Sequence, residues 1–227
     1  MNPATSTPAR RPPLPDPLGE AARRLGASEL LAYPTETVWG LGADARSERG
    51  LSNLRQFKGR DDGKPISVLV GRPDRLEAHG FRVDAGAAAL AERFWPGPLT
   101  LVLPHAGGFA RGVARAEDGA VGVRCSAHPL AAALALRLET EGLGPVTATS
   151  LNRSGDPAAR TALDARIVCT RARSGSVSPT LLPIEGAEAG GELESTVLDL
   201  TGERPRVLRW GALPEAELSP VLTELYA

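Results

Sequence analysis

The stretch from Tyr33 to Gly42 reads Tyr-Pro-Thr-Glu-Thr-Val-Trp-Gly-Leu-Gly, and it follows a short apolar run that begins at Glu29. An apolar run that ends at a proline is typical of a strand. Thr35 and Thr37 lie on the same side if the backbone is extended, and the two glycines would let a ligand approach the main chain closely. Ordinary strand or turn threonines are the alternative. The stretch therefore predicts a pocket for a small polar ligand at a strand end.

Five cations follow this stretch at the ends of expected elements. Lys58 and Arg60 fall at the C-terminal end of an expected helix, where they would offset the helix dipole. Lys64 comes next, and Arg124 and Arg209 each close a short apolar run. Several cations at element ends predict one cavity that neutralises a polyphosphate.

A second polar segment runs from Ser150 to Gly155 and reads Ser-Leu-Asn-Arg-Ser-Gly. Asn, Ser and Gly all favour turns, so an ordinary turn is the alternative. The same segment offers hydroxyl, amide and backbone N–H groups to phosphate or ribose oxygens. Because Thr35, Arg124 and Ser195 also stand at strand ends, we expect these ends to converge on one ligand site.

The apolar pattern predicts strands and helices that alternate without strict repeats. Apolar runs favour strands over residues 29–33, 66–70, 99–103, 121–124, 146–149, 195–200 and 206–209. Capping residues favour helices that begin near Ser47, Asp84, Pro129 and Thr161, with a short helix at the C-terminus. We therefore expect an α/β or α+β fold around one mixed sheet.

Composition sets further limits on the fold and its surroundings. The first seventeen residues are rich in proline, which predicts a disordered tail over 1–17 and one domain over 18–227. A formal net charge of −1 disfavours nonspecific nucleic-acid binding over the whole surface. No apolar stretch is long enough to span a membrane. Cys125 and Cys169 have no metal-ligand spacing, so we expect reduced thiols of a cytoplasmic protein and no protein-bound metal.

Together these segments resemble the YrdC/Sua5 family, the threonylcarbamoyl-AMP synthases, in its short single-domain form. The matching pieces occur in family order at residues 33–42, 58–60, 64–66, 95–103, 121–124, 128–129, 150–155, 194–197 and 209–211. The resemblance implies a twisted mixed sheet with helices around a large basic cavity. It also implies a reaction that joins L-threonine, bicarbonate or carbon dioxide, and ATP with Mg²⁺. Separate proteins would then transfer the threonylcarbamoyl group to adenosine 37 of tRNA.

The resemblance assigns roles residue by residue. Lys58 and Arg60 match the catalytic cations of the family. The positions that would contact threonine are Thr35, Thr37, Arg124, Thr149 and Ser195. The positions that would contact ATP are Lys58, Arg60, Lys64, Ser150, Asn152 and Arg209.

Several positions depart from the family pattern, and four of them bear on the site. Asp61 replaces a proline and brings an anion toward the expected phosphates, and Leu69 stands where many relatives carry a histidine. Ser126 replaces the usual proline after the arginine strand. Leu151 replaces a small alanine and is expected to crowd the nucleotide. A divergent relative with an altered substrate is therefore an alternative.

The implied chemistry asks the protein mainly to position reactants and to stabilise phosphate charge. The Ser- and Gly-rich segment 171–191 is expected to act as a lid that keeps water from a labile carbamate. Two other functions stay open. One is a module that binds double-stranded RNA, or tRNA, in the same basic cavity. The other is an enzyme that makes a carbamoyl adenylate from carbamoyl phosphate.

Overall fold

The computed structural model describes residues 16–59, 64–171, 177–182 and 187–226. Arg60 and Asp61 lie outside these ranges, as do parts of the expected lid. The helices are α1 (Pro17–Gly26), α2 (Glu48–Lys58), α3 (Ala85–Phe94), α4 (Pro129–Thr140), α5 (Ala162–Thr170) and α6 (Glu215–Leu225), with short 3₁₀ turns at Pro73–Arg75 and Glu77–His79. The strands are β1 (Leu31–Tyr33), β2 (Gly40–Gly42), β3 (Ser67–Leu69), β4 (Leu99–Leu103), β5 (Val121–Arg124), β6 (Val146–Ser150), β7 (Thr180–Leu181), β8 (Thr196–Asp199) and β9 (Arg206–Arg209).

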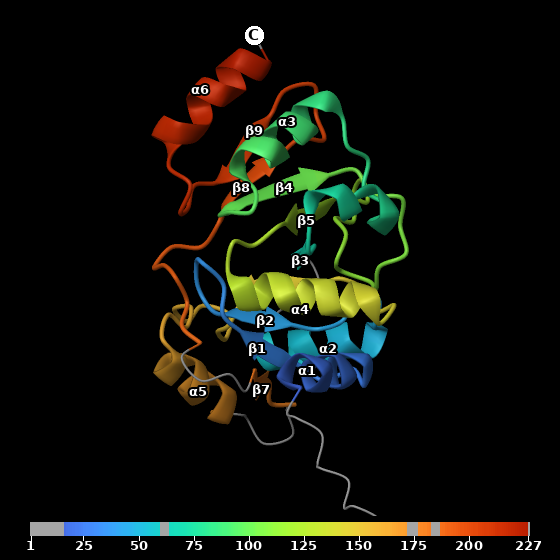
Figure 1. The fold of residues 1–227 in the computed structure, drawn as a ribbon, viewed down its shortest axis with the longest axis vertical. Helices are drawn as coiled ribbons and strands as arrows, with labels where there is room; N and C mark the ends of the chain where they lie inside the picture. The colour runs from blue at the N-terminus through green and yellow to red at the C-terminus, as the bar shows by residue number, and fades with distance from the viewer. Residues whose placement is uncertain (1–15, 60–63, 172–176, 183–186, 227) are drawn as a thin grey trace, which may run out of the picture.

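The described strands form one mixed sheet in the order β7-β1-β2-β6-β3-β5-β4-β8-β9 (Figure 1). The pairs β7/β1, β3/β5 and β4/β8 are parallel, and the other neighbours are antiparallel. This confirms the expected α/β fold around a mixed sheet.

Alternation along the strands divides the side chains between the two faces of the sheet. In β5, Val121 and Val123 enter the large core, where they meet residues of α2, α3 and α6. In β1, Leu31 and Tyr33 point the other way and pack with α1 and α4 in a second core. Both faces are therefore covered at the β1 end of the sheet.

The second face is open over the strands that α1 and α4 do not reach. Gly122 and Arg124 of β5, Thr100 and Val102 of β4, and Val197 of β8 line a cavity there. Their alternation with buried aliphatic neighbours explains this placement, because the small and polar residues all fall on one face. The fold thus leaves a polar floor exposed on half of one sheet face.

Helix α2 carries a predicted site residue to the edge of this floor. Ser47 caps the helix by accepting a hydrogen bond from the Gly50 N–H at 2.9 Å. At the other end Gly59 adopts φ 62°, a left-handed conformation that glycine takes without strain. The chain therefore turns away directly after Lys58, the last residue of the helix.

Three elements differ from the sequence-based expectation. Asp16 caps α1 and Pro17 is its first residue, so ordered structure starts before the predicted boundary at residue 18. Residues 1–15 of the predicted tail lie outside the described residues. Strands β2 and β7 were not predicted, because two or three residues carry too little alternation to indicate a strand.

Gly40 and Gly42 allow β2 to pack closely against its neighbours. Both lie in β2, beside β1. A Cβ on Gly40 would lie 2.8 Å from Cζ of Tyr33, and one on Gly42 would lie 2.6 Å from Cγ2 of Val146. The Tyr33 ring takes up the space beside both glycines, although Gly40 also lines the cavity described below and Gly42 does not.

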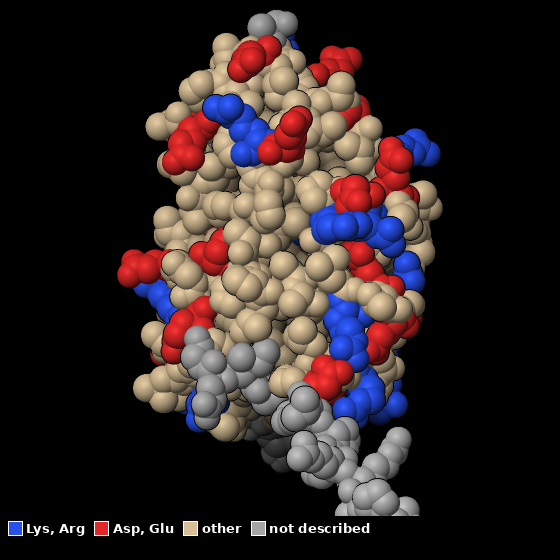
Figure 2. All heavy atoms as spheres, in the orientation of Figure 1, with Lys and Arg blue, Asp and Glu red and all other residues tan. Residues whose placement is uncertain are grey.

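Charged side chains of both signs are mixed on the face shown in Figure 2, mostly toward its edges. This view shows no continuous basic stripe. None of the described helices is both long and apolar enough to cross a membrane.

The packing of α2 yields the first prediction. Leu54→Ala removes a fully buried side chain from the large core and is expected to lower the free energy of unfolding by about 2–5 kcal/mol. The matched control is Leu163→Ala on an exposed position of α5, with an expected change below about 0.5 kcal/mol. Urea unfolding measures both, and equal losses would contradict the placement of α2.

Candidate functional site

A cavity of about 400 Å³ lies on the open half of the sheet. Ten of the predicted site residues line it: Thr35, Thr37, Lys58, Lys64, Arg124, Thr149, Ser150, Asn152, Ser195 and Arg209. They come from six different parts of the chain, between residues 35 and 209. The structure therefore brings together every predicted site residue that it describes. Arg60 alone lies outside the described residues.

Arg124 anchors one end of the cavity, which we call the arginine end. It is buried at the end of β5, and its Nη1 donates to Thr37 Oγ1 at 3.0 Å while its Nε donates to the Gly97 carbonyl at 3.1 Å. Thr35 Oγ1 donates to the Val38 carbonyl at 2.7 Å, so the 2.8 Å contact between the two threonine hydroxyls uses the Thr37 proton. Thr35 thus holds Thr37, and Thr37 is the hydroxyl beside the guanidinium.

Glu36 is a residue of this end to which sequence reasoning gave no role. Its Oε1 lies 2.7 Å from Arg124 Nη2. Burial on its own raises the pKa of the Glu36 carboxyl, but the Arg124 charge and a hydrogen bond from Ser126 outweigh it and hold that pKa below its usual value. The signal in the sequence was a carboxylate between two threonines, in the same stretch that predicted the pocket.

Thr100 is a second residue that was missed, although it breaks the apolar run of β4. It is buried, and its Oγ1 lies 2.8 Å from Ser195 Oγ. Arg209 reaches the same place from β9, with Nη2 donating to the Ser195 carbonyl at 2.8 Å and Nη1 paired with Glu194. The resemblance placed Ser195 and Arg209 on different sides of the pocket, whereas the structure joins them directly.

Lys58 anchors the other end of the cavity, the lysine end. Its buried Nζ donates to the Ser150 carbonyl at 2.6 Å and to Asn152 Oδ1 at 2.7 Å. Ser150 Oγ donates to the same Oδ1 at 2.9 Å, and Asn152 Nδ2 donates to the Asp156 carbonyl at 2.6 Å. These bonds fix an ammonium group against a polar loop, and the exposed Lys64 is a further cation among the lining residues.

The buried position of Leu151 corrects one expectation. Leu151 does not line the cavity: it is fully buried in the large core, and its backbone N–H donates to the Trp39 carbonyl at 2.8 Å. Contrary to the expectation, Leu151 is therefore not placed to crowd a nucleotide in the cavity. Leu69 does line the cavity, from the floor strand β3.

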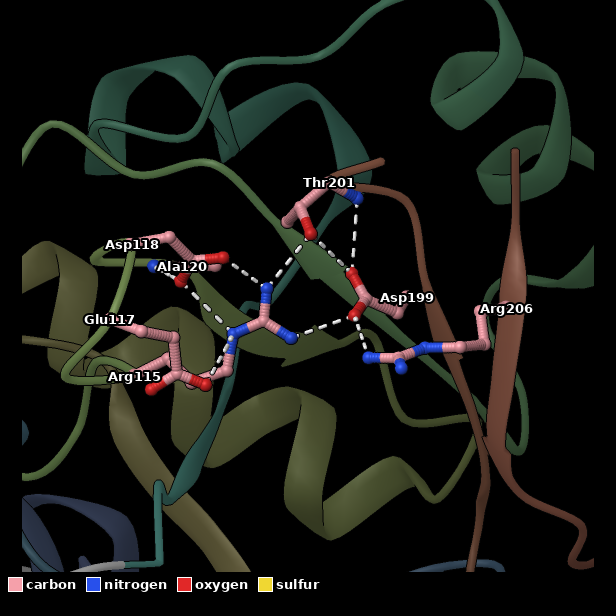
Figure 3. A network of polar contacts seen from close by, with 7 residues as sticks. All are labelled: Arg115, Glu117, Asp118, Ala120, Asp199, Thr201 and Arg206. Carbon is pink, nitrogen blue, oxygen red and sulfur yellow. Dashed lines mark hydrogen bonds and ion pairs between the residues drawn. The ribbon is translucent and has the colours of Figure 1, made fainter. Parts of the chain in front are cut away.

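Figure 3 shows a network of ion pairs and hydrogen bonds around Arg115. Arg115 lines the cavity, and its Nη1 donates to Asp199 Oδ2 at 2.7 Å while its Nη2 donates to Thr201 Oγ1 at 2.8 Å and contacts Asp118. Burial would raise the pKa of the Asp199 carboxyl, but the Thr201 and Arg115 hydrogen bonds outweigh it and lower that pKa to about 2. This network joins the loop before β5 to the end of β8.

Comparison with known proteins gives a consistent result. The family model for Sua5, YciO and YrdC, described as "Telomere recombination", matches residues 23–211. The threonylcarbamoyl-AMP synthase of Pyrococcus abyssi is 36% identical over 211 residues, which is 90% of this chain and 57% of that protein. The threonylcarbamoyl-AMP synthase of Chromohalobacter salexigens is 38% identical over 192 residues, or 84% of this chain and 97% of that protein. The chain thus spans just over half of the first relative and nearly all of the second.

Solved structures agree with the sequence comparison. P. abyssi Sua5 complexed with L-threonine has a TM-score of 0.77 at 36% identity, covering 90% of this chain and 56% of that one. Escherichia coli YciO has a TM-score of 0.73 at 22% identity, covering 90% of this chain and 94% of that one, and this likeness bears on the fold alone.

The Arg115–Asp199 pair makes stability depend on pH. A folded-state pKa of about 2, below the ordinary 3.8, gives a stabilisation that is complete above pH 4 and is lost as the pH falls toward 2. The gap in unfolding free energy between wild type and Asp199→Asn should therefore shrink by about 2 kcal/mol over this window. Urea unfolding at each pH measures it. The control is Asp74→Asn at an exposed site, and a gap that does not change with pH would contradict the assignment.

Proposed function

Because the chain belongs to the Sua5/YciO/YrdC family, we propose that it makes threonylcarbamoyl-AMP and pyrophosphate from L-threonine, bicarbonate or carbon dioxide, and ATP. Such an enzyme is a nucleotidyltransferase, since it moves the AMP part of ATP onto a carbamate oxygen. The observation that carries the proposal is that one cavity is lined by both a buried guanidinium, Arg124, and a buried ammonium, Lys58. Separate proteins would pass the threonylcarbamoyl group to adenosine 37 of tRNA.

The arginine end suits the amino acid. A guanidinium forms strong hydrogen bonds with a carboxylate, and the buried Arg124 is among the residues that line the cavity. Thr37 stands beside it, and the Thr100–Ser195 hydroxyl pair would bond the threonine hydroxyl. A substrate without that hydroxyl would leave buried polar groups unpaired, which is how such a site rejects valine.

The lysine end suits the triphosphate. Lys58 is oriented by Ser150 and Asn152, and Lys64 lines the same cavity. Arg60 joins them by the family resemblance. Mg²⁺ would enter with ATP as part of the substrate. Among the described residues no group of three His, Cys, Asp or Glu side chains is placed to hold a metal, so the phosphates and water would supply its ligands.

The reaction then needs two bond-forming steps. The neutral threonine amine attacks carbon dioxide, which forms the N–C bond, and loss of the amine proton leaves a carbamate. A carbamate oxygen attacks the α-phosphorus of ATP, and the bond to the β-phosphate oxygen breaks to release pyrophosphate. The cations stabilise the charge that grows on the phosphate oxygens, without a protein nucleophile.

The RNA-binding alternative has less support. Relatives named as threonylcarbamoyl-AMP synthases favour the synthase over an RNA-binding module. The mixed charges on the face in Figure 2 and the net charge of −1 agree with this preference. We place the enzyme in the cytoplasm, because both cysteines are free and buried, as suits a reducing compartment.

Omission of each substrate tests the function. Pyrophosphate release should require L-threonine, bicarbonate and ATP together, and L-valine in place of threonine should reduce it by about 100-fold or more. A coupled pyrophosphate assay measures the rate. Release that is independent of threonine would contradict the synthase, and salt-dependent retention of double-stranded RNA without any turnover would support the RNA-binding alternative.

Removal of the cations tests the lysine end. Lys58→Met keeps the length of the side chain but removes its charge, and it should lower kcat for pyrophosphate release by about 100-fold or more. Arg60→Ala should do the same. Arg49→Ala, at an exposed position of the same helix, is the control and should keep full activity. Circular dichroism must show a folded protein for each variant, since loss of the fold would make the cation structural.

A further inference from the structure

Arg124 is paired with Glu36, and Glu36 is in turn hydrogen-bonded by Ser126. Glu36 does not line the cavity, whereas Arg124 and Thr37 do. The Glu36 carboxylate therefore meets the guanidinium from the side away from the bound substrate. Oε1 and Nη2 lie 2.7 Å apart, yet neither atom has an aligned hydrogen-bond partner among the described residues. The contact is a close ion pair that holds the Nη2 side of the guanidinium, and the protein encloses both atoms.

Ser126 fixes the other oxygen of this carboxylate. Its hydroxyl donates to Glu36 Oε2 and accepts a hydrogen bond from the His128 backbone N–H at 3.2 Å. Ser126 is 2% exposed, so these bonds form away from water. The hydroxyl has one proton, which it donates in the hydrogen bond to Glu36 Oε2. The turn between β5 and α4 therefore sets the orientation of the carboxylate.

The backbone of Glu36 is confined as well. The N–H groups of Gly190 and Gly191 donate to the carbonyls of Thr35 and Thr37, each at 2.9 Å. A Cβ on Gly190 would lie 3.0 Å from the Cα of Glu36. The backbone around Glu36 and both of its carboxylate oxygens have defined partners. Glu36 therefore presents its carboxylate to Arg124 in a fixed orientation.

We propose that Glu36, oriented by Ser126, is a positioning residue that sets Arg124 to receive the α-carboxylate of the amino-acid substrate. This rests on the proposed function in taking threonine as the ligand. An arginine held at Nε, Nη1 and Nη2 from three directions loses little freedom on binding, so more of its hydrogen-bond energy contributes to affinity. Glu36 acts through Arg124 and does not touch the substrate.

Binding of two related ligands tests this inference. L-Threonine carries the carboxylate that Arg124 would receive, and L-threoninamide carries a neutral amide in its place. Glu36→Gln keeps the side-chain size and should raise the Kd of L-threonine by about ten- to hundred-fold, while Ser126→Ala should raise it by about two- to ten-fold. The Kd of L-threoninamide and the Kd of ATP should not change. Isothermal titration calorimetry measures all three.

Controls separate positioning from a general loss of structure. Ser126→Thr keeps the hydroxyl and should restore threonine binding, and Glu92→Gln on the exposed face of α3 should have no effect. Equal weakening of L-threonine and L-threoninamide would overturn the proposal, as would unchanged or tighter threonine binding in Glu36→Gln and Ser126→Ala. A wild-type protein that binds ATP but not threonine would instead contradict the proposed function.

Discussion

A buried guanidinium imposes much of the arrangement around it. Arg124 ends a strand whose other residues are glycine and valine, and a charge in that position is costly unless it is paired and hydrogen-bonded. Its partners come from elsewhere in the chain: Glu36 and Thr37 from the loop after β1, and the Gly97 carbonyl from the turn before β4. The order of the central strands therefore serves electrostatics as well as packing, because it places these loops around one side chain.

The cavity exists because one sheet face is covered over only half of its width. Helices α1 and α4 pack on Leu31, Tyr33 and Leu69. Beyond them the strands present mostly small or polar residues, with Val102 and Val197 among them, and such a surface gives a helix little apolar area to pack on. Gly122 shows how tight this floor is, since a Cβ there would lie 2.4 Å from Ser67 Oγ. The cavity thus lies where the second core does not extend over the sheet.

Sequence reasoning reached the long elements other than α1, and the polar strand ends, but not the contacts between distant residues. The run Val121 to Arg124 predicts a strand with a polar end. The structure has this strand, and Arg124 at its end lines the cavity. The short strand β2 carries no comparable pattern, and the sequence did not show that its glycines pack against the Tyr33 ring. Leu151 was misjudged for the same reason: a sequence shows side-chain size but not which face of the loop it occupies. Ser126, which donates a hydrogen bond to Glu36, lies 90 residues away in the sequence, and only the fold reveals this contact.

The two ends of the cavity also bear on the geometry of the proposed reaction. The Cα of threonine carries a carboxylate, a hydroxyethyl group, an amine and a hydrogen. If Arg124 takes the carboxylate and the Thr100–Ser195 pair takes the hydroxyl, two of the four directions are fixed by groups that are already buried and hydrogen-bonded. The amine is then the polar substituent left to face the lysine end, where Lys58 is itself held in place. Carbamate formation between the two ends would bring the new oxygen toward the α-phosphate without movement of either anchor, which is the form that catalysis by positioning takes.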